Sequence, residues 1–184
     1  KISKFKSEGN EKIHVLSDFD RTMTTWILPN GEKMPSLISR IRNGPYLGKE
    51  YSDKANKLYD YYHPIEIDNK LSIKEKKKLM HEWWFKHFEL LGESGLNKKV
   101  IQKVAEDLID GEKINLRNGV RKFLNKLEKN KIPLVIISSS VGDLIEEFLK
   151  KENLMKENVF VIANKLDYDF GGRFIGVKEI VHVF

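Results

Sequence analysis

Three short apolar runs along the chain have the length of buried β-strands. They span residues 13–17, 132–138 and 159–163, and the second is almost continuously apolar. Runs of about four to eight apolar residues are typical of strands buried on both faces of a parallel sheet. Amphipathic helices are predicted on either side of the second run, over 119–130 and 142–152. The order helix, strand, helix, strand predicts a βαβ arrangement in a parallel sheet. The buried faces of the two helices are expected to carry Val120, Phe123, Leu124 and Leu127, and Leu144, Ile145, Phe148 and Leu149.

The stretch from residue 26 to residue 116 has helical periodicity and contains no convincing strand pattern. Three helices are predicted there from apolar side chains at helical spacing: Leu58, Tyr61 and Tyr62; Leu79, Trp83, Trp84, Phe88 and Leu91; and Val100, Ile101, Val104, Leu108 and Ile109. This helical insert directly follows the first predicted strand. We therefore predict a helical cap domain formed by 26–116 over an α/β core formed by 1–25 and 117–184.

Residues 166–176 alternate in polarity around Gly171 and Gly172, which predicts a β-hairpin. The acidic residues Asp167 and Asp169 would also suit a calcium loop, but the ligand spacing of an EF-hand and its closing glutamate are missing. A hairpin is therefore the favoured interpretation.

The composition is that of a globular protein and limits the classes of partner. Of the 184 residues, 40% are hydrophobic and none is cysteine, so disulfides and cysteine–zinc sites are excluded. No apolar run approaches the roughly 20 residues of a membrane-spanning helix. The net charge of +6 either attracts an anionic partner or reflects solvated lysine-rich helix faces such as 74–78. We favour the second interpretation and predict a cytoplasmic protein without a nucleic-acid or membrane partner.

Two carboxylates, Asp18 and Asp20, stand where the first predicted strand enters a loop. In open α/β sheets, ligands bind at this carboxyl end of the strands. If the backbone turns after Asp18, both side chains can reach one site. One carboxylate can then attack an electrophile while the other handles the proton, and the pair attracts a divalent cation. The alternative is a loop or helix cap built on Asp20 and Thr22.

A serine-rich segment, residues 138–143, follows the strongest predicted strand and opens a predicted helix. The start of a helix has free backbone N–H groups and a partial positive charge, so phosphate binds there readily. Ser138 can add a hydroxyl donor, and Ser139 can add its backbone N–H. The alternative is helix capping by the serines and Asp143. Because parallel strands end at one edge of the sheet, we expect this segment to face the same crevice as Asp18.

These motifs resemble those of the haloacid dehalogenase superfamily of phosphotransferases. Residues 18–24 are similar to its first motif, and Ser138 fits the serine that closes its second. More narrowly, most of the chain resembles the cytosolic pyrimidine 5′-nucleotidase family. The segments that carry this resemblance are 16–22, 61–68, 82–84, 132–133, 138–147, 164–169 and 180–184. The resemblance implies a doubly wound, Rossmannoid parallel-sheet core with a helical cap inserted after the first strand.

The resemblance also implies a Mg²⁺-dependent 5′-nucleotidase that works through an aspartyl-phosphate intermediate. Asp18 would be the nucleophile and Asp20 the general acid–base. The Asp18 carboxylate and the Asp20 backbone carbonyl would bind Mg²⁺. Ser138 and Ser139 would hold phosphate oxygens.

In the predicted cap, Glu66 matches the glutamate that reads the base in this family. A carboxylate can accept a hydrogen bond from the exocyclic amine of cytosine. Trp83 and Trp84 can stack on a base, and packing inside the cap would explain them equally well. His87 stands where the family has a small hydroxyl residue, so it is a further candidate substrate-binding residue and leaves the base preference open.

Two alternatives to a pyrimidine nucleotidase stay open at this point. The catalytic motif also suits another phosphatase or phosphotransferase of the superfamily, acting on a small phosphoester such as a phosphoamino acid or a sugar phosphate. The resemblance further implies a lysine that screens the phosphate and later aspartates that complete the Mg²⁺ site, and neither has a counterpart up to Phe184. An inactive fragment of such an enzyme is therefore the second alternative. The oligomeric state is left undetermined.

Overall fold

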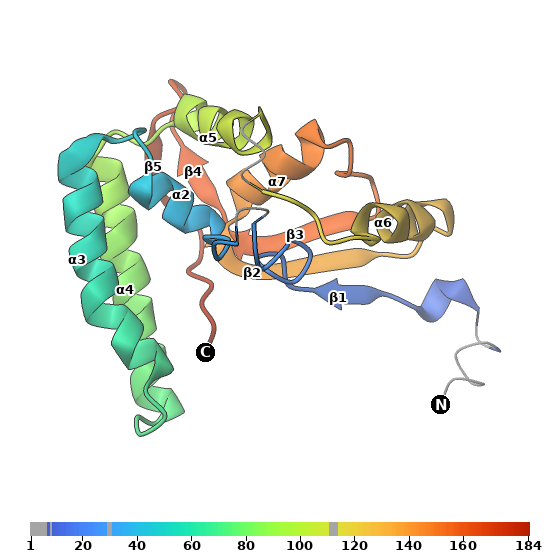
Figure 1. Cartoon of the computed structure of the whole chain (residues 1–184), viewed down its shortest axis with the longest axis horizontal. Coiled ribbons are helices and arrows are strands. Elements are labelled where there is room, and N and C mark those ends of the chain that lie inside the picture. Colours follow the sequence, from blue (N-terminus) through green and yellow to red (C-terminus); the bar gives the residue numbers. More distant parts are fainter. Residues whose placement is uncertain (1–6, 8, 29–30, 111–113) are drawn as a thin grey trace.

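The core of the fold is a three-stranded parallel sheet in the order β1-β2-β3 (Figure 1). The computed structural model describes residue 7 and residues 9–28, 31–110 and 114–184. A short 3₁₀ helix, η1 (Asn10–Lys12), precedes the sheet, whose strands are β1 (Val15–Ser17), β2 (Leu134–Val141) and β3 (Val159–Asn164). The parallel sheet predicted from the three apolar runs is confirmed.

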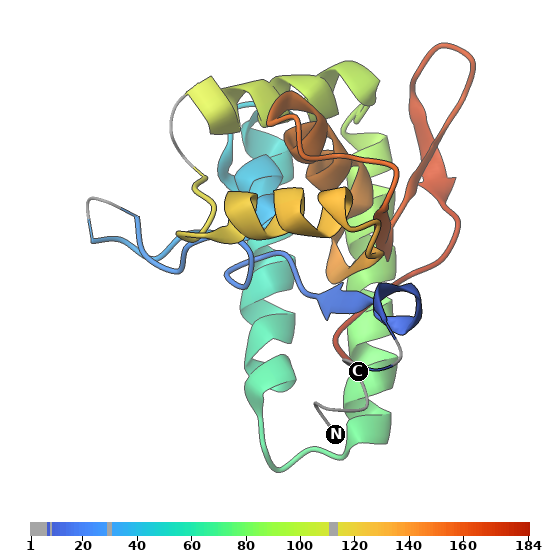
Figure 2. The same ribbon diagram turned by 90° about the vertical axis from the view of Figure 1, so that its right-hand side faces the viewer.

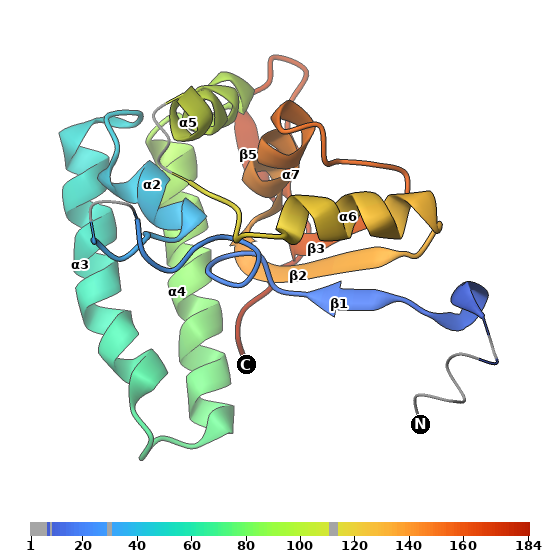
Figure 3. The same cartoon turned by 45° about the vertical axis from the view of Figure 1, so that its right-hand side comes forward.

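Two helices cover one face of this sheet, α6 (Val120–Lys129) and α7 (Gly142–Lys151) (Figure 3). Both form where the amphipathic pattern predicts them. The prediction was wrong for Phe123, which is 46% exposed. This side chain lies at the edge of the apolar stripe of α6, whereas Leu124 and Leu127 lie at its centre and are buried.

The opposite face of the sheet carries exposed apolar side chains. Side chains alternate between the two faces of a strand, and the register of the three strands puts Leu16, Ile137, Phe160 and Ile162 on one face. These four side chains are between 44% and 60% exposed. A doubly wound fold has helices on both faces of its sheet, but in the part of the chain that the structure describes only the α6–α7 face is covered.

Between β1 and α6 the described residues form four helices. They are α2 (Leu37–Asn43), α3 (Gly48–Ile67), α4 (Ile73–Glu93) and α5 (Lys98–Asp110). The periodicity predicted three of them and missed α2, which is only seven residues long. α3 and α4 form a long antiparallel pair beside the sheet (Figure 1), whereas α5 packs against α7 of the predicted core. The division into a cap and a core therefore stays a prediction.

The two longest helices are not membrane spans. α3 and α4 have 20 and 21 residues, but no described helix is long and apolar enough to cross a membrane. α4 begins with a capping box, in which the side chains of Ser72 and Glu75 each accept the backbone N–H of the other residue. This cap fixes the point at which the chain turns from α3 into α4.

The hairpin predicted over 166–176 is confirmed as the antiparallel pair β4 (Leu166–Tyr168) and β5 (Phe174–Val177). It projects beside α4 (Figure 2), and the ring of Phe174 lies 6.4 Å from that of Phe88 in α4. The hairpin thus connects the sheet side of the molecule to the α3–α4 pair.

Removal of the buried ring of Phe148 is expected to destabilise the fold. This side chain of α7 packs edge-on against Phe19 with ring centroids 5.8 Å apart. Phe148→Ala should lower the free energy of unfolding, measured in urea by circular dichroism, by about 3–5 kcal/mol. The matched control is Phe123→Ala in α6, which removes a half-exposed ring and should change that free energy by about 1 kcal/mol or less. Equal losses in both variants would contradict this description of the core.

Candidate active site

The loop after β1 folds back on itself and brings Asp18 and Asp20 to one cavity. The Phe19 carbonyl accepts the backbone N–H groups of residues 22–24, at 3.0–3.3 Å. Arg21 has a φ of 62°, in the left-handed region that residues other than glycine rarely adopt. The chain therefore turns sharply after Asp18, as the first of the two sequence-based alternatives requires.

Arg117, just before α6, fixes this loop. Its guanidinium donates to the backbone carbonyls of Arg21 (2.6 Å) and Thr24 (3.2 Å), and its backbone N–H donates to the carbonyl of Met23 (2.9 Å). Sequence reasoning missed Arg117. No local motif marks it, because its partners lie more than 90 positions away in the chain.

Asp18 lies at the C-terminal end of β1, and its side chain is exposed. Its Oδ2 accepts a hydrogen bond from the hydroxyl of Thr22 at 2.9 Å. That bond orients the carboxylate at the mouth of the cavity. An exposed and oriented carboxylate is suited to attack an electrophile.

Asp20 lies deeper, and its surroundings raise its pKa. Both carboxylate oxygens accept the backbone N–H of Leu37 at the start of α2, at 3.2 and 3.3 Å. Together, its surroundings raise the pKa of Asp20 from 3.8 to about 6: burial raises it most, the bond from Leu37 lowers it, and the negative charge of Asp18 raises it again. The hydroxyl of Ser140 lies close enough to lower the pKa slightly, but its geometry falls short of a hydrogen bond. Asp20 therefore exchanges a proton near neutral pH, which suits a general acid–base.

The serine segment 138–140 lies within the last residues of β2, so the strand runs beyond its predicted end at Ser138, whereas the next helix begins at the predicted residue. β2 continues to Val141 with an irregular register after Ile137, and α7 begins at Gly142. The strand is longer than predicted because β3 extends to Asn164, which pairs with Val141. The serines therefore line the cavity from a strand end.

Asn164, fully buried at the end of β3, holds the serine segment in place. Its Nδ2 donates to the carbonyls of Ser139 (2.7 Å) and Val181 (2.9 Å), and its Oδ1 accepts the backbone N–H of Val181 (2.8 Å). Within the segment, the Ser138 hydroxyl oxygen accepts the backbone N–H of Ser140 at 3.2 Å. One amide side chain thus connects the ends of β2 and β3 to the last residues of the chain.

A cavity of about 610 Å³ lies between the C-terminal ends of β1 and β2 and the α3–α4 pair. The seven site residues predicted from the sequence all line it: Asp18, Asp20, Glu66, Trp83, His87, Ser138 and Ser139. Trp84, Arg42 and His182 line it as well. Sequence reasoning missed Arg42, which belongs to no recognisable motif, and gave no role to His182, although it lies in the family-like segment 180–184.

The wall of the cavity that comes from α3 and α4 is aromatic. Trp83 stacks on Tyr62 with ring planes 10° apart, and Trp84 stacks on His87 with planes 13° apart. Both tryptophans therefore have packing partners inside the protein while they line the cavity. Glu66 is in the same wall and lies 2.9 Å from the Nδ1 of His63.

His87 is buried in α4 and contributes shape rather than charge. Its Nε2 lies 3.0 Å from the hydroxyl of Tyr51. Burial and, to a lesser extent, the positive charge of Arg42 together lower the pKa of His87 from 6.5 to about 4. The ring is therefore neutral at neutral pH.

The carboxylate oxygens beside the loop are the type of ligand that a hard cation prefers. Mg²⁺ prefers oxygen ligands and usually keeps several waters. Asp18 and Asp20 supply such oxygens. In the described residues there is no cluster of three or more histidine, cysteine, aspartate or glutamate side chains able to hold a metal ion. Among the described residues, Asp18 and Asp20 are the carboxylates beside the loop that could serve as ligands to such an ion.

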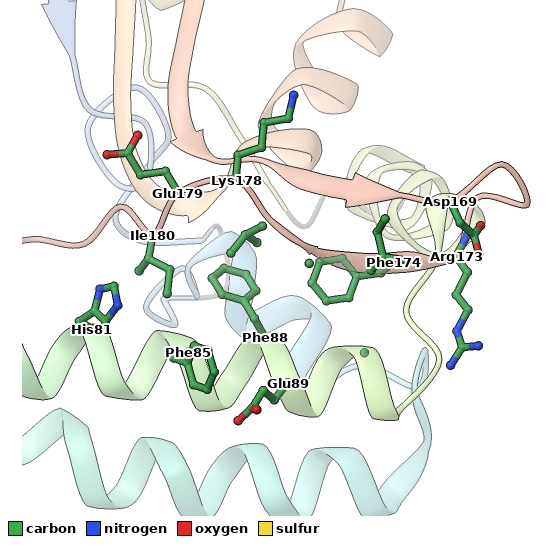
Figure 4. A pocket seen from close by; sticks show the side chains of 14 residues that line it. His81, Phe85, Phe88, Glu89, Asp169, Arg173, Phe174, Lys178, Glu179 and Ile180 are labelled. Atoms are coloured by element: carbon green, nitrogen blue, oxygen red, sulfur yellow. The ribbon is translucent and has the colours of Figure 1, made fainter.

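A second hollow, of about 920 Å³, lies between α4 and the β4–β5 hairpin (Figure 4). Phe85, Phe88 and Phe174 give it an apolar lining. Neither Asp18 nor Asp20 lines it, so it is separate from the candidate active site.

Comparison with known sequences finds a family of phosphatases. The model of the family described as pyrimidine 5′-nucleotidase (UMPH-1) matches residues 21–184. The chain is 35% identical over 185 residues to a Xenopus laevis protein named 7-methylguanosine phosphate-specific 5′-nucleotidase A. This alignment covers all of the chain and 62% of the relative, so the chain spans about three fifths of the length of the curated relative that it matches.

Two solved structures have a similar fold. The crystal structure of cytosolic 5′-nucleotidase IIIB bound to cytidine has a TM-score of 0.83 at 28% identity, covering 98% of this chain and 58% of that one. A phosphoserine phosphohydrolase-like protein from Francisella tularensis has a TM-score of 0.53 at 17% identity, covering 90% of this chain and 64% of that one. At this low sequence identity, the similarity to the second structure indicates a shared fold and nothing about function.

Because its pKa is raised, ionised Asp20 is expected to destabilise the folded protein. The unfolded chain releases this proton near pH 3.8 and the folded chain near 6, so the stability that the protonated form contributes is lost as the pH rises through this window. Asp20→Asn keeps an acceptor for the Leu37 N–H. It should raise the free energy of unfolding by about 1–3 kcal/mol at about pH 7.5 and leave it nearly unchanged near pH 3.5.

Urea unfolding at both pH values measures this effect. The matched control is Asp53→Asn on the exposed face of α3, which should change stability little at either pH. A gain of equal size at both pH values in Asp20→Asn would show that burial of the charge is not its cause.

Proposed function

The chain belongs to the pyrimidine 5′-nucleotidase (UMPH-1) family that its motifs predicted, and from this premise we propose that it hydrolyses nucleoside 5′-monophosphates, pyrimidine nucleotides above all, to nucleoside and phosphate. The observation that carries the proposal is the single cavity shared by two carboxylates, a serine segment and an aromatic wall. A phosphate ester needs the first two surfaces, and a nucleobase needs the third.

In the first step, Asp18 attacks the substrate phosphorus. A bond forms between an Asp18 carboxylate oxygen and phosphorus while the bond between phosphorus and O5′ of the nucleoside breaks. Asp20 donates its proton to O5′, so the nucleoside leaves as a neutral alcohol. The Ser138 hydroxyl and the Ser139 N–H donate hydrogen bonds to the phosphate oxygens.

In the second step, water hydrolyses the aspartyl-phosphate. Asp20, now a carboxylate, takes a proton from water as the water oxygen attacks phosphorus. The bond between phosphorus and Asp18 breaks, and inorganic phosphate is released. Both acids return to their starting states, so one pair of carboxyl groups completes the cycle.

Mg²⁺ is the cofactor that we propose for this site. The Asp18 carboxylate and the Asp20 backbone carbonyl would hold it. When bound, it neutralises negative charge on the transferring phosphoryl group. The exposed side chain of Asp18, whose carboxylate oxygens can act as metal ligands, supports this assignment.

The α3–α4 wall would bind the base. Glu66 would accept a hydrogen bond from an exocyclic amine, and Trp83 and Trp84 would offer ring faces for stacking. His87 would close this wall as a neutral ring. The similar fold of cytosolic 5′-nucleotidase IIIB, which was crystallised with bound cytidine, supports a pyrimidine in this position.

The second candidate substrate is 7-methylguanosine 5′-monophosphate. Its support is the name of the 35% identical relative, a 7-methylguanosine phosphate-specific 5′-nucleotidase. A cytoplasmic location agrees with the word cytosolic in the name of the structural relative.

Asp18→Asn is expected to lower kcat for CMP and UMP by about 10³-fold or more, since an amide cannot form the phosphoenzyme. A colorimetric phosphate assay measures turnover. Calorimetry should show that CMP still binds, because the exposed Asp18 side chain supports neither the core nor the base wall. Asp53→Asn is the control and should keep full turnover. Retained activity in Asp18→Asn would refute its assignment as nucleophile.

Glu66→Ala is expected to lower kcat/KM for CMP by about tenfold or more, because a base donor loses its acceptor. The loss on p-nitrophenyl phosphate, which has no base, should be clearly smaller. Glu89→Ala, an exposed change in α4 outside this cavity, serves as the control. Equal losses on both substrates would instead make Glu66 a structural residue.

A further inference from the structure

We propose that His63 is a positioning residue for base recognition: it bonds to one oxygen of the Glu66 carboxylate and so orients the other oxygen to accept a donor of the base. The inference rests on the proposed nucleotidase function, in which Glu66 binds the base, and adds the residue that orients it.

The bond between His63 and Glu66 occupies one carboxylate oxygen and leaves the other free. The two residues lie three positions apart on α3, a spacing that makes side chains neighbours on a helix. The Nδ1 of His63 lies 2.9 Å from the Oε2 of Glu66. A carboxylate can only accept, so the hydrogen of this bond is on Nδ1. Oε1 accepts no hydrogen bond from any residue that the structure describes, so it is left for a ligand.

Both side chains can be reached from the cavity. His63 and Glu66 line it, and their side chains are 37% and 26% exposed. An exocyclic amine is the base donor that suits the free oxygen of Glu66. Cytosine and 7-methylguanine both carry such an amine, so the same orientation of the carboxylate serves either candidate substrate.

The ring of His63 is itself held by packing. It stacks on the ring of Tyr59, with centroids 4.7 Å apart and planes 15° apart. Tyr59 in turn contacts the guanidinium of Arg42, whose central carbon lies 4.1 Å from the ring centroid. The ring of Trp83 lies 6.0 Å from that of Tyr59. A residue that orients a binding group needs such support, because a mobile ring would leave the carboxylate mobile as well.

Helix stability does not explain why a glutamate stands at position 66. α3 ends at Ile67, so Glu66 lies in its last turn, where the partial negative charge of the free carbonyls disfavours a carboxylate. The pair Glu50 and Lys54 is the opposite case, since its acid lies in the first turn and both side chains are exposed. An acid that opposes the helix dipole and lines a cavity is typical of a functional position.

Two substitutions separate the donor of His63 from its ring. His63→Phe keeps a ring on Tyr59 and removes the donor, whereas His63→Asn removes the ring and keeps an N–H donor near the place of Nδ1. The measured quantity is kcat/KM for CMP, for 7-methylguanosine 5′-monophosphate and for p-nitrophenyl phosphate, which has no base. The matched control is Lys54→Met, which breaks the exposed pair with Glu50 on the same helix, outside the cavity.

His63→Phe is expected to lower kcat/KM about fivefold on the better of the two nucleotides, because Glu66 loses its orienting bond. The loss should lie mainly in KM, since the base wall changes while the groups around the phosphate do not. The value for p-nitrophenyl phosphate should stay within about twofold. His63→Asn should keep the nucleotide value within about twofold, and Lys54→Met should leave all values unchanged.

The decisive measurement repeats His63→Phe in the Glu66→Ala background. A residue that acts through Glu66 has no effect once the carboxylate is gone, so the double variant should match Glu66→Ala within about twofold on the nucleotide. The ratio of nucleotide to p-nitrophenyl phosphate is compared throughout, because loss of folded protein lowers both rates by the same factor.

A full fivefold loss in the Glu66→Ala background would overturn the assignment of His63, as would an equal loss on p-nitrophenyl phosphate in the single variant. Failure of the proposed function would look different: the unsubstituted protein would hydrolyse neither nucleotide.

Discussion

The active-site arrangement depends on one sharp turn of the chain, directly after Asp18. Within a strand, side chains two residues apart point to the same face. Asp18 and Asp20 follow the end of the strand, so strand geometry does not fix where their side chains point. The Phe19 carbonyl, which gathers three backbone N–H groups, and the left-handed conformation of Arg21 set that direction. Arg117 then holds the turn from a distant part of the sequence. The sheet supplies the edge, and the turn places both carboxylates at it.

The same turn gives the two acids different surroundings and therefore different chemistry. Asp18 stays exposed and bonded to a hydroxyl, whereas Asp20 is partly buried against the start of α2. Burial of the second carboxyl raises its pKa to about 6, which places its proton exchange near neutral pH. That shift is unfavourable for folding once the group is ionised, and active sites commonly hold such unfavourable groups. The proposed proton transfer and some loss of stability would thus have a single cause.

The cavity has two sides of unlike origin. Strand ends provide the carboxylates and the serine segment, which suit a phosphate ester in general. The α2–α4 helices provide His63, Glu66 and the aromatic side chains, which suit a base with particular donors and acceptors. A fold of this class does not determine its substrate, so under the proposed function the choice of nucleotide would depend on the helical side. Asn164 connects the sheet side to residues near the end of the chain, which also line the cavity.

The sequence by itself determined the parallel strands, the helices flanking β2, the hairpin and the positions of the paired acids. These features have local signals, namely hydrophobic periodicity, turn residues and short motifs. Such signals depend only on residues that are close together in the chain. Only the tertiary structure decided that β2 runs on to Val141, since that extension needs a partner strand. It alone revealed Arg42, Arg117 and Asn164, because each acts through residues distant in sequence, and such contacts leave no periodic pattern. Local preferences define the elements, whereas burial at the site and bonds between distant residues arise only when the elements pack together.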